Sequence, residues 1–372
     1  MTELLELLKE LVAIDSVNPA LIPGGAGERE IGAFVASWCE QAGLSVEVEE
    51  AAPGRPNVIA TAHGTGRGRT LLLNAHMDTV GVEAMAAPFE ARVEDGRLYG
   101  RGAYDMKGSL AAIMSVAAEA KRRRFAGDVV LAAVSDEEVA SVGTEALLDG
   151  ERRFDAAVVA EPTELRVAVA HKGFCGFQIE THGRAAHGSR PDLGVDAIVR
   201  MGPILVELDA LAKRLLAGAP HSLVGTGSVH ASLIEGGQEY SSYPERCLLT
   251  GERRTLPGET AATVEAELEA LLAGSAGQPA LRMVLSRDPF QVGEDEEIVR
   301  LARRHAGTGV VGVPFWTDAA LFAAAGIPTV VFGPAGEGAH AAVEWVDLAS
   351  VERCKEMLLA VAADFCAEKD QA

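Results

Sequence analysis

The chain has 372 residues, of which 48% are hydrophobic and 23% charged, and its formal net charge is -21. This length and composition indicate a folded globular protein of about two domains and exclude extended disorder. The strong negative charge argues against nucleic acid and anionic membrane surfaces as partners.

The termini and cysteines suggest where the protein works. Five cysteines are scattered without a C-x-x-C pair, which favours reduced thiols. The acidic, amphipathic N-terminal segment lacks the basic start and apolar centre of a signal peptide. No apolar run reaches the roughly 18 residues that a membrane-spanning helix requires. We therefore predict a cytoplasmic protein.

The first half of the chain alternates apolar strands with helices. We predict helices over residues 2–14, 28–41 and 109–123, and strands over residues 45–49, 57–62, 70–75, 128–134 and 156–160. Residues 97–108 form a predicted glycine-rich turn into the third helix. Apolar strands separated by helices indicate an α/β fold with a mainly parallel sheet.

The pattern changes near residue 173. Strands are predicted over residues 174–181, 228–234, 245–254 and 281–285, and helices over residues 193–216 and 260–272. This β-α-β-β-α-β order is that of an α+β, ferredoxin-like (split βαβ) unit. The α/β alternation then returns, with helices over residues 294–305, 317–325 and 347–368 and a strand over residues 328–332. We therefore predict one α/β domain, residues 1–172 and 286–372, interrupted by an inserted domain, residues 173–285.

Polar residues stand where the predicted strands of the α/β domain end. His76 and Asp78 follow strand 70–75, Glu137 and Glu138 follow strand 128–134, and Glu161 follows strand 156–160. Because ligand sites in such sheets lie beyond the carboxyl ends of the strands, we expect these side chains to share one site.

Two further polar residues complete a set that suits two divalent ions. Asp105 follows the glycine-rich turn, and His340 follows the loop of residues 333–338. Each ion would take one histidine and one carboxylate, and a shared carboxylate would bridge them. Asp78 suits a hydrogen bond to the other ring nitrogen of His76, and Glu137 can point into the cleft as a general base.

Each of these residues also has an ordinary interpretation. Residues 136–138 could be a solvated acidic loop, Asp105 a helix cap and His340 a core histidine. Their coincidence at the ends of strands favours the metal site.

Five segments resemble one known family, the co-catalytic zinc amidohydrolases and exopeptidases of the aminoacylase type. This family includes acetylornithine deacetylase, succinyl-diaminopimelate desuccinylase and glutamate carboxypeptidase. The matching segments are LLLNAHMDTV, LYGRGAYDMKGSLAA, SDEEVASVGTEALL, VVAEPTEL and GAHAAVEWV. The resemblance extends over nearly the whole chain.

The resemblance implies a role for each residue of the proposed site. His76 and Glu161 would bind one zinc ion, Glu138 and His340 the other, and Asp105 would bridge them, with cobalt or manganese as possible substitutes. Glu137 would be the general acid/base, and Asp78 would orient His76. The resemblance also implies a cis peptide bond between Asp105 and Met106.

Two motifs of the inserted domain resemble the same family. HGRAAHGSRP resembles the family motif G-x-A-A-H-x-S-x-P. This resemblance implies that the protein is a homodimer in which His187 reaches the active site of the partner subunit. It also implies that the inserted domain acts in dimerisation or as a lid. ERRTLPG resembles R-x-x-P-G, which implies that Arg254 grips a substrate carboxylate and that Arg253 faces solvent, although these roles could be exchanged. Ser241 stands where the family commonly has asparagine, which leaves the substrate open.

The implied reaction is metal-dependent hydrolysis of the amide bond of an N-acyl amino acid, as in the deacetylase and desuccinylase members. A dipeptidase or glutamate-type carboxypeptidase is the alternative within the family. A more remote alternative is a catalytically inactive relative that binds an amino acid or a metal. The expected partners are a small-molecule N-acyl amino acid or dipeptide and a second copy of the chain.

Overall fold

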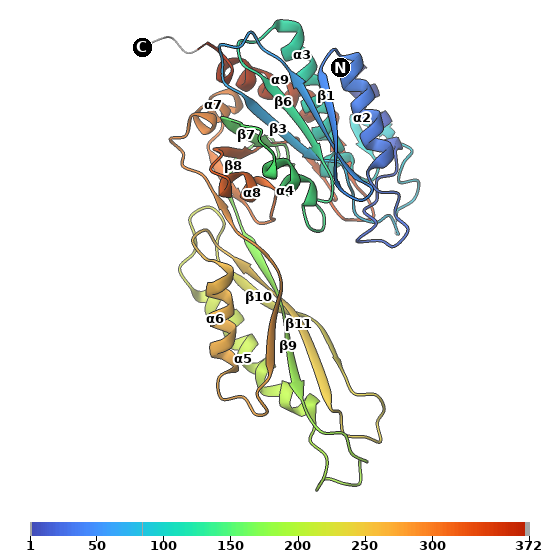
Figure 1. The fold of residues 1–372 in the computed structure, drawn as a ribbon, viewed down its shortest axis with the longest axis vertical. Coiled ribbons are helices and arrows are strands. Elements are labelled where there is room, and N and C mark those ends of the chain that lie inside the picture. The colour runs from blue at the N-terminus through green and yellow to red at the C-terminus, as the bar shows by residue number, and fades with distance from the viewer. Residues whose placement is uncertain (1, 84, 369–372) are drawn as a thin grey trace. The chain divides into compact units, whose positions relative to one another are not determined.

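The structure is a computed structural model that describes residues 2–83 and 85–368, and it divides the chain into two compact units (Figure 1). The first unit comprises Met1–Val169, Val292–Val311 and Thr317–Ala372. The second comprises Ala170–Gln291 and Gly312–Trp316. The division at residues 172/173 and 285/286 stays a prediction.

The first unit is a mixed α/β structure. Its helices and the helical turn η1 are α1 (Thr2–Ala13), α2 (Arg29–Gln41), η1 (Ala103–Lys107), α3 (Gly108–Arg123), α4 (Val142–Asp149), α7 (Glu297–Ala306), α8 (Ala319–Ala324) and α9 (Leu348–Phe365). Its larger sheet includes β1 (Ser45–Ala52), β2 (Arg55–Ala62), β3 (Leu71–His76), β6 (Val129–Val134), β7 (Ala156–Val159) and β15 (Thr329–Val331). Three short strands also belong to that sheet: β8 (Val167–His171), β13 (Phe290–Gln291) and β14 (Val310–Val313).

The centre of the large sheet explains why its strand ends meet. The strand order is β1-β2-β6-β3-β7-β15-β8-β13, and the central strands β6, β3, β7 and β15 run parallel. Every residue of β3 and β6 is buried, so both faces of the sheet are covered. Helix α3 packs against β2, β3 and β6, while α8 packs against β7 and β15. The carboxyl ends of β3, β6 and β7 therefore lie together at one edge.

A small sheet lies beside this edge. It has the order β16-β17-β5-β4 and is formed by β4 (Arg92–Glu94), β5 (Arg97–Tyr99), β16 (Gly336–Glu337) and β17 (Trp345–Asp347). Tyr99 of β5 pairs with Trp345 of β17. This pairing brings the start of η1 against the loop that leads into β17.

The second unit has one four-stranded sheet with helices on one face (Figure 1). Its elements are β9 (Gly173–His182), α5 (Ala197–Ala217), β10 (Ser228–Gly236), β11 (Arg246–Thr255), α6 (Ala261–Leu272) and β12 (Ala280–Arg287). The antiparallel order β10-β11-β9-β12 is the ferredoxin-like order. The predicted fold class, a mainly parallel α/β sheet with an inserted α+β unit, is confirmed.

Helix α4 and the short strands β4, β13, β14, β16 and β17 were not predicted, and three further elements differ in a way that the sequence explains or should have shown. The helix expected from residue 193 begins at Ala197, because the Asp196 carboxylate accepts a hydrogen bond from Val199 N at 2.9 Å and caps it there. The stretch expected to be only a turn also contains β5 and η1. Strand β8, which pairs antiparallel with β15 and β13, was not predicted, although Pro162 marks a turn before its apolar run.

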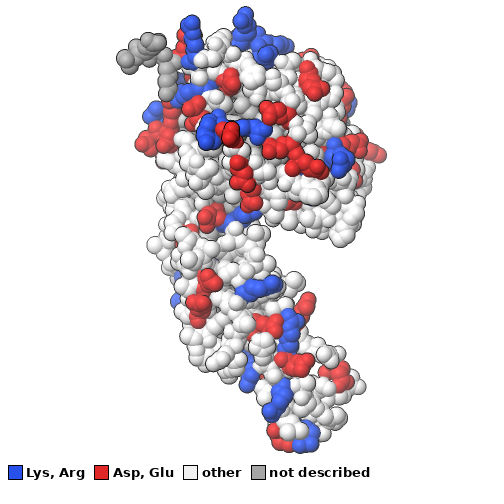
Figure 2. Space-filling view, viewed as in Figure 1, with Lys and Arg blue, Asp and Glu red and all other residues white. Residues whose placement is uncertain are grey.

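Two surface properties bear on the predicted partners. Among the described residues, no helix is both long and apolar enough to cross a membrane. Figure 2 shows that acidic and basic side chains are interspersed over the displayed face. The predicted cytoplasmic location stays a prediction.

Candidate metal centre

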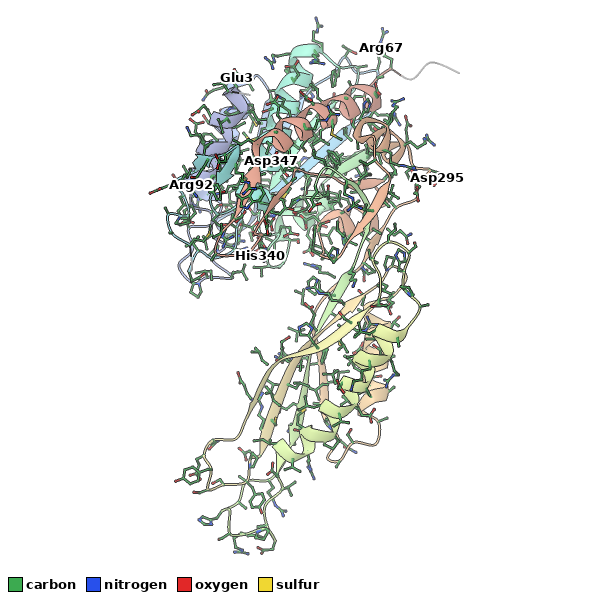
Figure 3. All side chains as sticks on the ribbon, turned by 180° about the vertical axis from the view of Figure 1, so that it is seen from behind. Glu3, Arg67, Arg92, Asp295, His340 and Asp347 are labelled. Atoms are coloured by element: carbon green, nitrogen blue, oxygen red, sulfur yellow. The ribbon has the colours of Figure 1, made fainter. Side chains whose placement is uncertain are left out.

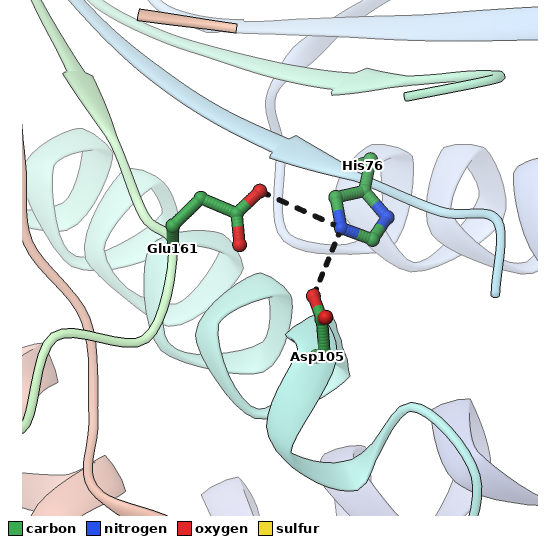
Figure 4. Close-up of side chains that lie close together, drawn as sticks. All are labelled: His76, Asp105 and Glu161. Atoms are coloured by element: carbon green, nitrogen blue, oxygen red, sulfur yellow. Dashed lines mark hydrogen bonds and ion pairs between the residues drawn. The ribbon is translucent and has the colours of Figure 1, made fainter. Parts of the chain in front are cut away.

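His76 stands at the carboxyl end of β3 with its ring nearly inaccessible to solvent. Its Nδ1 lies 2.9 Å from the main-chain oxygen of Asp78, so Nδ1 carries the proton and donates it. Its Nε2 is therefore the nitrogen available to a metal ion, 3.2 Å from Asp105 Oδ1 and 3.6 Å from Glu161 Oε1 (Figure 4). A neutral imidazole with its other nitrogen held this way is a typical zinc ligand.

Asp105 lies in η1, where the expected cis peptide bond joins it to Met106. Its two carboxylate oxygens face different histidines. Oδ1 lies near His76, and Oδ2 lies 3.4 Å from His340 Nε2. This is the geometry that a bridging carboxylate requires.

A second group of ligand atoms forms around His340. This residue follows β16, and Figure 3 shows it on the underside of the first unit. Its Nε2 lies 3.1 Å from Glu138 Oε2. The ligand atoms of His76, Asp105 and Glu161 lie within 4.8 Å of one another, and so do those of Asp105, Glu138 and His340. The sheet ends and loops thus bring all five predicted ligands together.

The residues fit a pair of metal ions. Glu138 Oε1 is buried and has no hydrogen-bond partner in the described part of the chain. A buried, unpaired carboxylate oxygen is costly unless a cation satisfies it. Nitrogen and oxygen ligands in two triads that share one carboxylate suit Zn²⁺ and leave coordination positions open.

The electrostatics of the centre are strongly perturbed. Burial, together with repulsion from Asp105, raises the pKa of Glu161 well above its usual range, and burial also raises the pKa of Glu138. Although burial opposes it, hydrogen bonding to His340 and His76 lowers the pKa of Asp105. Hydrogen bonds to Asp105 and Glu138 raise the pKa of His340 to about 10. Groups coupled in this way are typical of functional sites.

Glu137 and Asp78 lie beside the ligands. Burial and the charge of Glu161 raise the pKa of Glu137. The carboxylate of Asp78 accepts hydrogen bonds from Glu137 N at 3.1 Å and Glu138 N at 3.2 Å. Its Oδ1 lies 3.6 Å from His76 Nδ1, farther than the Asp78 carbonyl. Asp78 therefore contacts His76 mainly through its main chain and holds the next loop with its side chain.

The second unit carries the two remaining predicted residues. His187 is exposed, and its Nδ1 accepts a hydrogen bond from Ser189 N at 3.2 Å, which leaves Nε2 as an exposed donor. Arg254 is partly exposed, with its guanidinium 5.3 Å from the Phe174 ring centroid and Nε 2.6 Å from Glu252 Oε1.

The prediction that Arg253 faces solvent is wrong. Its side chain is 2% exposed and pairs with Glu259 at 2.8 Å and Glu267 at 3.1 Å. Alternation along β11 puts Arg253 on the face covered by helices, in phase with buried Cys247 and Leu249, and puts Arg254 on the opposite face.

Several buried polar residues around the centre were not predicted from the sequence. Glu344 accepts hydrogen bonds from Tyr104 N at 2.9 Å and Asp105 N at 3.0 Å, and its Oε2 lies 2.6 Å from Arg101 Nη1. Asp318, whose pKa burial raises to about 6, accepts a hydrogen bond from Thr144 Oγ1 at 2.6 Å. Glu344 lies in GAHAAVEWV and Arg101 in LYGRGAYDMKGSLAA, two of the segments that resemble the family. The sequence does not indicate that the two side chains meet, because their contact depends on the pairing of β5 with β17.

The sequence is similar to known proteins over most of its length. Residues 72–364 match the profile of peptidase family M20/M25/M40. The chain is 32% identical to an acetylornithine deacetylase of Myxococcus xanthus, over 96% of each protein. It is 27% identical to an N-formyl-4-amino-5-aminomethyl-2-methylpyrimidine deformylase of Halalkalibacterium halodurans, over 98% of this chain and 94% of the relative.

Solved structures agree at the level of the fold. A tripeptidase from Staphylococcus aureus superposes with a TM-score of 0.80 at 21% identity, covering 98% of each chain. A metallo-carboxypeptidase of the M20 family from Sulfolobus solfataricus gives a TM-score of 0.81 at 18% identity, covering 98% of this chain and 99% of that one.

Proposed function

Because the chain belongs to peptidase family M20/M25/M40, as its motifs indicated, we propose that it is a di-zinc hydrolase that removes the acyl group from an N-acyl amino acid. That it is a hydrolase acting on amide bonds follows from the family and from its deacetylase relatives. The number and identity of the metal ions, the residue roles and the substrate are the parts that we propose.

One observation carries the proposal: two triads of ligand atoms share the carboxylate of Asp105. His76 and Glu161 complete one triad, and Glu138 and His340 complete the other. Two bound zinc ions would polarise the scissile carbonyl and lower the pKa of the attacking water to roughly 7.

Glu137 would transfer the proton of the attacking water. Glu137 lies beside Glu138 without being part of either triad, so its carboxylate is available to accept a proton from water. Its raised pKa keeps it close to the range in which a general base can also return the proton. Glu137 would pass that proton to the departing amine.

A second copy of the chain would supply the oxyanion donor. Nε2 of His187 carries the ring proton and is exposed, which suits a hydrogen bond to a developing negative charge. Strand β10 lies at the edge of its sheet with Leu233 and Ile234 exposed, and α5 exposes Val199 and Val206. Exposed apolar residues along a sheet edge and a neighbouring helix favour an interface, so we propose a homodimer.

Substrate recognition would involve Arg254. Its position over the Phe174 ring orients the guanidinium, and a carboxylate can accept two parallel hydrogen bonds from such a group. An N-acyl amino acid and a dipeptide both offer a carboxylate there. The acetylornithine deacetylase relatives favour the acyl amino acid.

Replacement of Glu137 by alanine tests the proposal. We expect two zinc ions per chain in both wild type and variant, and turnover of N-acetylornithine reduced by about 10²–10⁴-fold in the variant. Elemental analysis measures the metal, and a panel of N-acetylornithine, succinyl-diaminopimelate and small dipeptides measures the activity. Substantial activity in Glu137→Ala would remove Glu137 from the base role. Faster turnover of dipeptides would favour the peptidase alternative, and bound metal without hydrolysis of any compound would favour the inactive binding relative.

A further inference from the structure

The turn that carries Glu137 and Glu138 is fixed by buried carboxylates. Asp136 has a left-handed φ of 70°, and its N–H donates to Glu28 Oε1 at 3.1 Å. The next two amides of the turn donate to the two oxygens of Asp78. Three successive N–H groups are therefore bound by only two side chains, both almost inaccessible to solvent.

Asn18 joins these carboxylates. Its Nδ2 donates to Asp78 Oδ2 at 2.8 Å and to Asp136 Oδ1 at 3.0 Å, while its Oδ1 accepts from Arg55 Nη1 at 3.1 Å. Arg55 also pairs with Asp136 at 2.5 Å and with Glu28 at 2.9 Å. Asn18 is fully buried, so a neutral amide keeps two carboxylates that would otherwise repel each other at a fixed separation.

The main chain fixes Asn18 itself. Its N–H donates to Thr79 O at 2.8 Å, and Thr79 N donates to Ser16 O at 3.0 Å. The loop after α1 is therefore tied to the segment that directly follows Asp78. These main-chain hydrogen bonds hold Asn18 beside Asp78.

We propose that Asn18 is a positioning residue. It fixes the position of the base Glu137 and of the triad that contains Glu138 relative to the triad that contains His76. The inference rests on the proposed function and extends it. Asp78 connects the two triads, because its carbonyl holds the His76 ring while its carboxylate holds the amides of Glu137 and Glu138. Asn18 provides the one side-chain donor to the Asp78 carboxylate among the described residues.

The variant Asn18→Asp keeps the shape of the side chain but replaces the donor group by an acceptor. We expect the affinity of the Glu138–His340 triad for zinc to fall by about 10- to 100-fold, the range typical for residues that support metal ligands. We expect kcat to fall by a similar factor and KM to change by less than about threefold, because Asn18 is buried away from substrate. Calorimetric zinc titration and elemental analysis after dialysis read the metal without any substrate.

Asn57→Asp is the matched control. Asn57 is equally buried, and its amide donates to Gly143 O at 2.8 Å and accepts from Ser135 N at 3.1 Å, but its hydrogen bonds in the described part of the chain include none to Asp78 or Asp136. We expect this control to lower Tm while retaining two zinc ions and kcat within about threefold. Equal losses of zinc affinity and kcat in both variants would overturn the proposal, because they would indicate general destabilisation.

Asn18→Ala keeps the test decisive if Asn18→Asp does not fold. It removes the donor without adding a charge, and we expect one weakened zinc site and a kcat reduced by about tenfold. Two tight sites and wild-type kcat in folded Asn18→Ala would overturn the inference. A wild type that binds two ions without hydrolysing amides would overturn the proposed function alone, and a wild type that binds no metal would overturn both.

Discussion

Replacement of Glu344 by glutamine would test how the bridging ligand is held. The Glu344 side chain is fully buried and accepts four hydrogen bonds. Tyr104 N at 2.9 Å and Asp105 N at 3.0 Å share Oε1, while Gly102 N at 3.1 Å and Arg101 Nη1 at 2.6 Å share Oε2. A glutamine offers one acceptor oxygen, so two of the four donors would face an NH2 group.

The expected loss of stability follows from the burial of the ion pair between Glu344 and Arg101. Arg101 is 4% exposed, and removing one partner of a buried ion pair costs roughly 3–5 kcal/mol. In a unit of this size each kcal/mol shifts Tm by about 2–4 °C, so we expect Glu344→Gln to lower Tm by about 6–20 °C. Zinc affinity should also fall, because the main chain of Asp105 loses its anchor. Scanning calorimetry of the metal-free protein separates the two effects.

Two further variants control this experiment. Glu356→Gln breaks the exposed pair with Arg353, in which both side chains are more than half exposed, and should lower Tm by less than about 4 °C. Arg101→Met should cost less than Glu344→Gln, because Glu344 would retain its three main-chain donors. A Tm of Glu344→Gln within about 2 °C of wild type would contradict the anchoring role of Glu344, and so would a larger loss of Tm in Arg101→Met.

Two more predictions concern the second triad and the inserted unit. The pKa of His340 in the metal-free protein, about 10, lies above its ordinary 6.5, so its protonated form stabilises the fold below pH 6.5 and this contribution is lost as the pH rises towards 10. Because zinc binds the neutral ring, the affinity of this triad for zinc should rise by about tenfold per pH unit between pH 6.5 and 8.5. Calorimetric titration in buffers of different ionisation enthalpy measures this rise. A pH-independent affinity would contradict the role of His340 as a zinc ligand. Arg253→Met should destabilise the protein by somewhat less than the roughly 3–5 kcal/mol of a fully buried pair, since Glu259 and Glu267 are partly exposed, whereas Arg254→Met should raise KM with little change in Tm.

The sheet and most of the centre could be predicted because they follow from local patterns. His76, Glu138 and Glu161 come just after apolar strands, and parallel strands bring their carboxyl ends to one edge. Asp105 in η1 and His340 after β16 lie away from that sheet. Their residue types and their places after glycine-rich turns put them in the predicted set, but their meeting depends on the short strands β5 and β17, which were not predicted.

The supporting residues could not be predicted in the same way. Asn18 contacts Asp78 and Asp136 across 60 and 118 residues, and such hydrogen bonds leave no period in the sequence. The wrong prediction that Arg253 faces solvent has a different cause. Cys247, Leu249 and Gly251 alternate in phase with it, so strand alternation already indicated a buried position.

The buried carboxylates of the first unit differ in how their charge is compensated, and this difference supports the metal centre. Glu344 is paired with Arg101, and Glu28 with Arg55. Among the described residues, the ion pairs of Asp105, Glu138 and Glu161 involve only His76 and His340.

Two imidazoles cannot fully offset three ligand carboxylates and the neighbouring Glu137, and mutual repulsion adds to burial in raising the pKa values of Glu137, Glu138 and Glu161. Two divalent cations would supply four positive charges and favour the ionised forms of these carboxylates. Ions bound by the ligands would therefore also favour the ionised form of Glu137, in which it can act as a base.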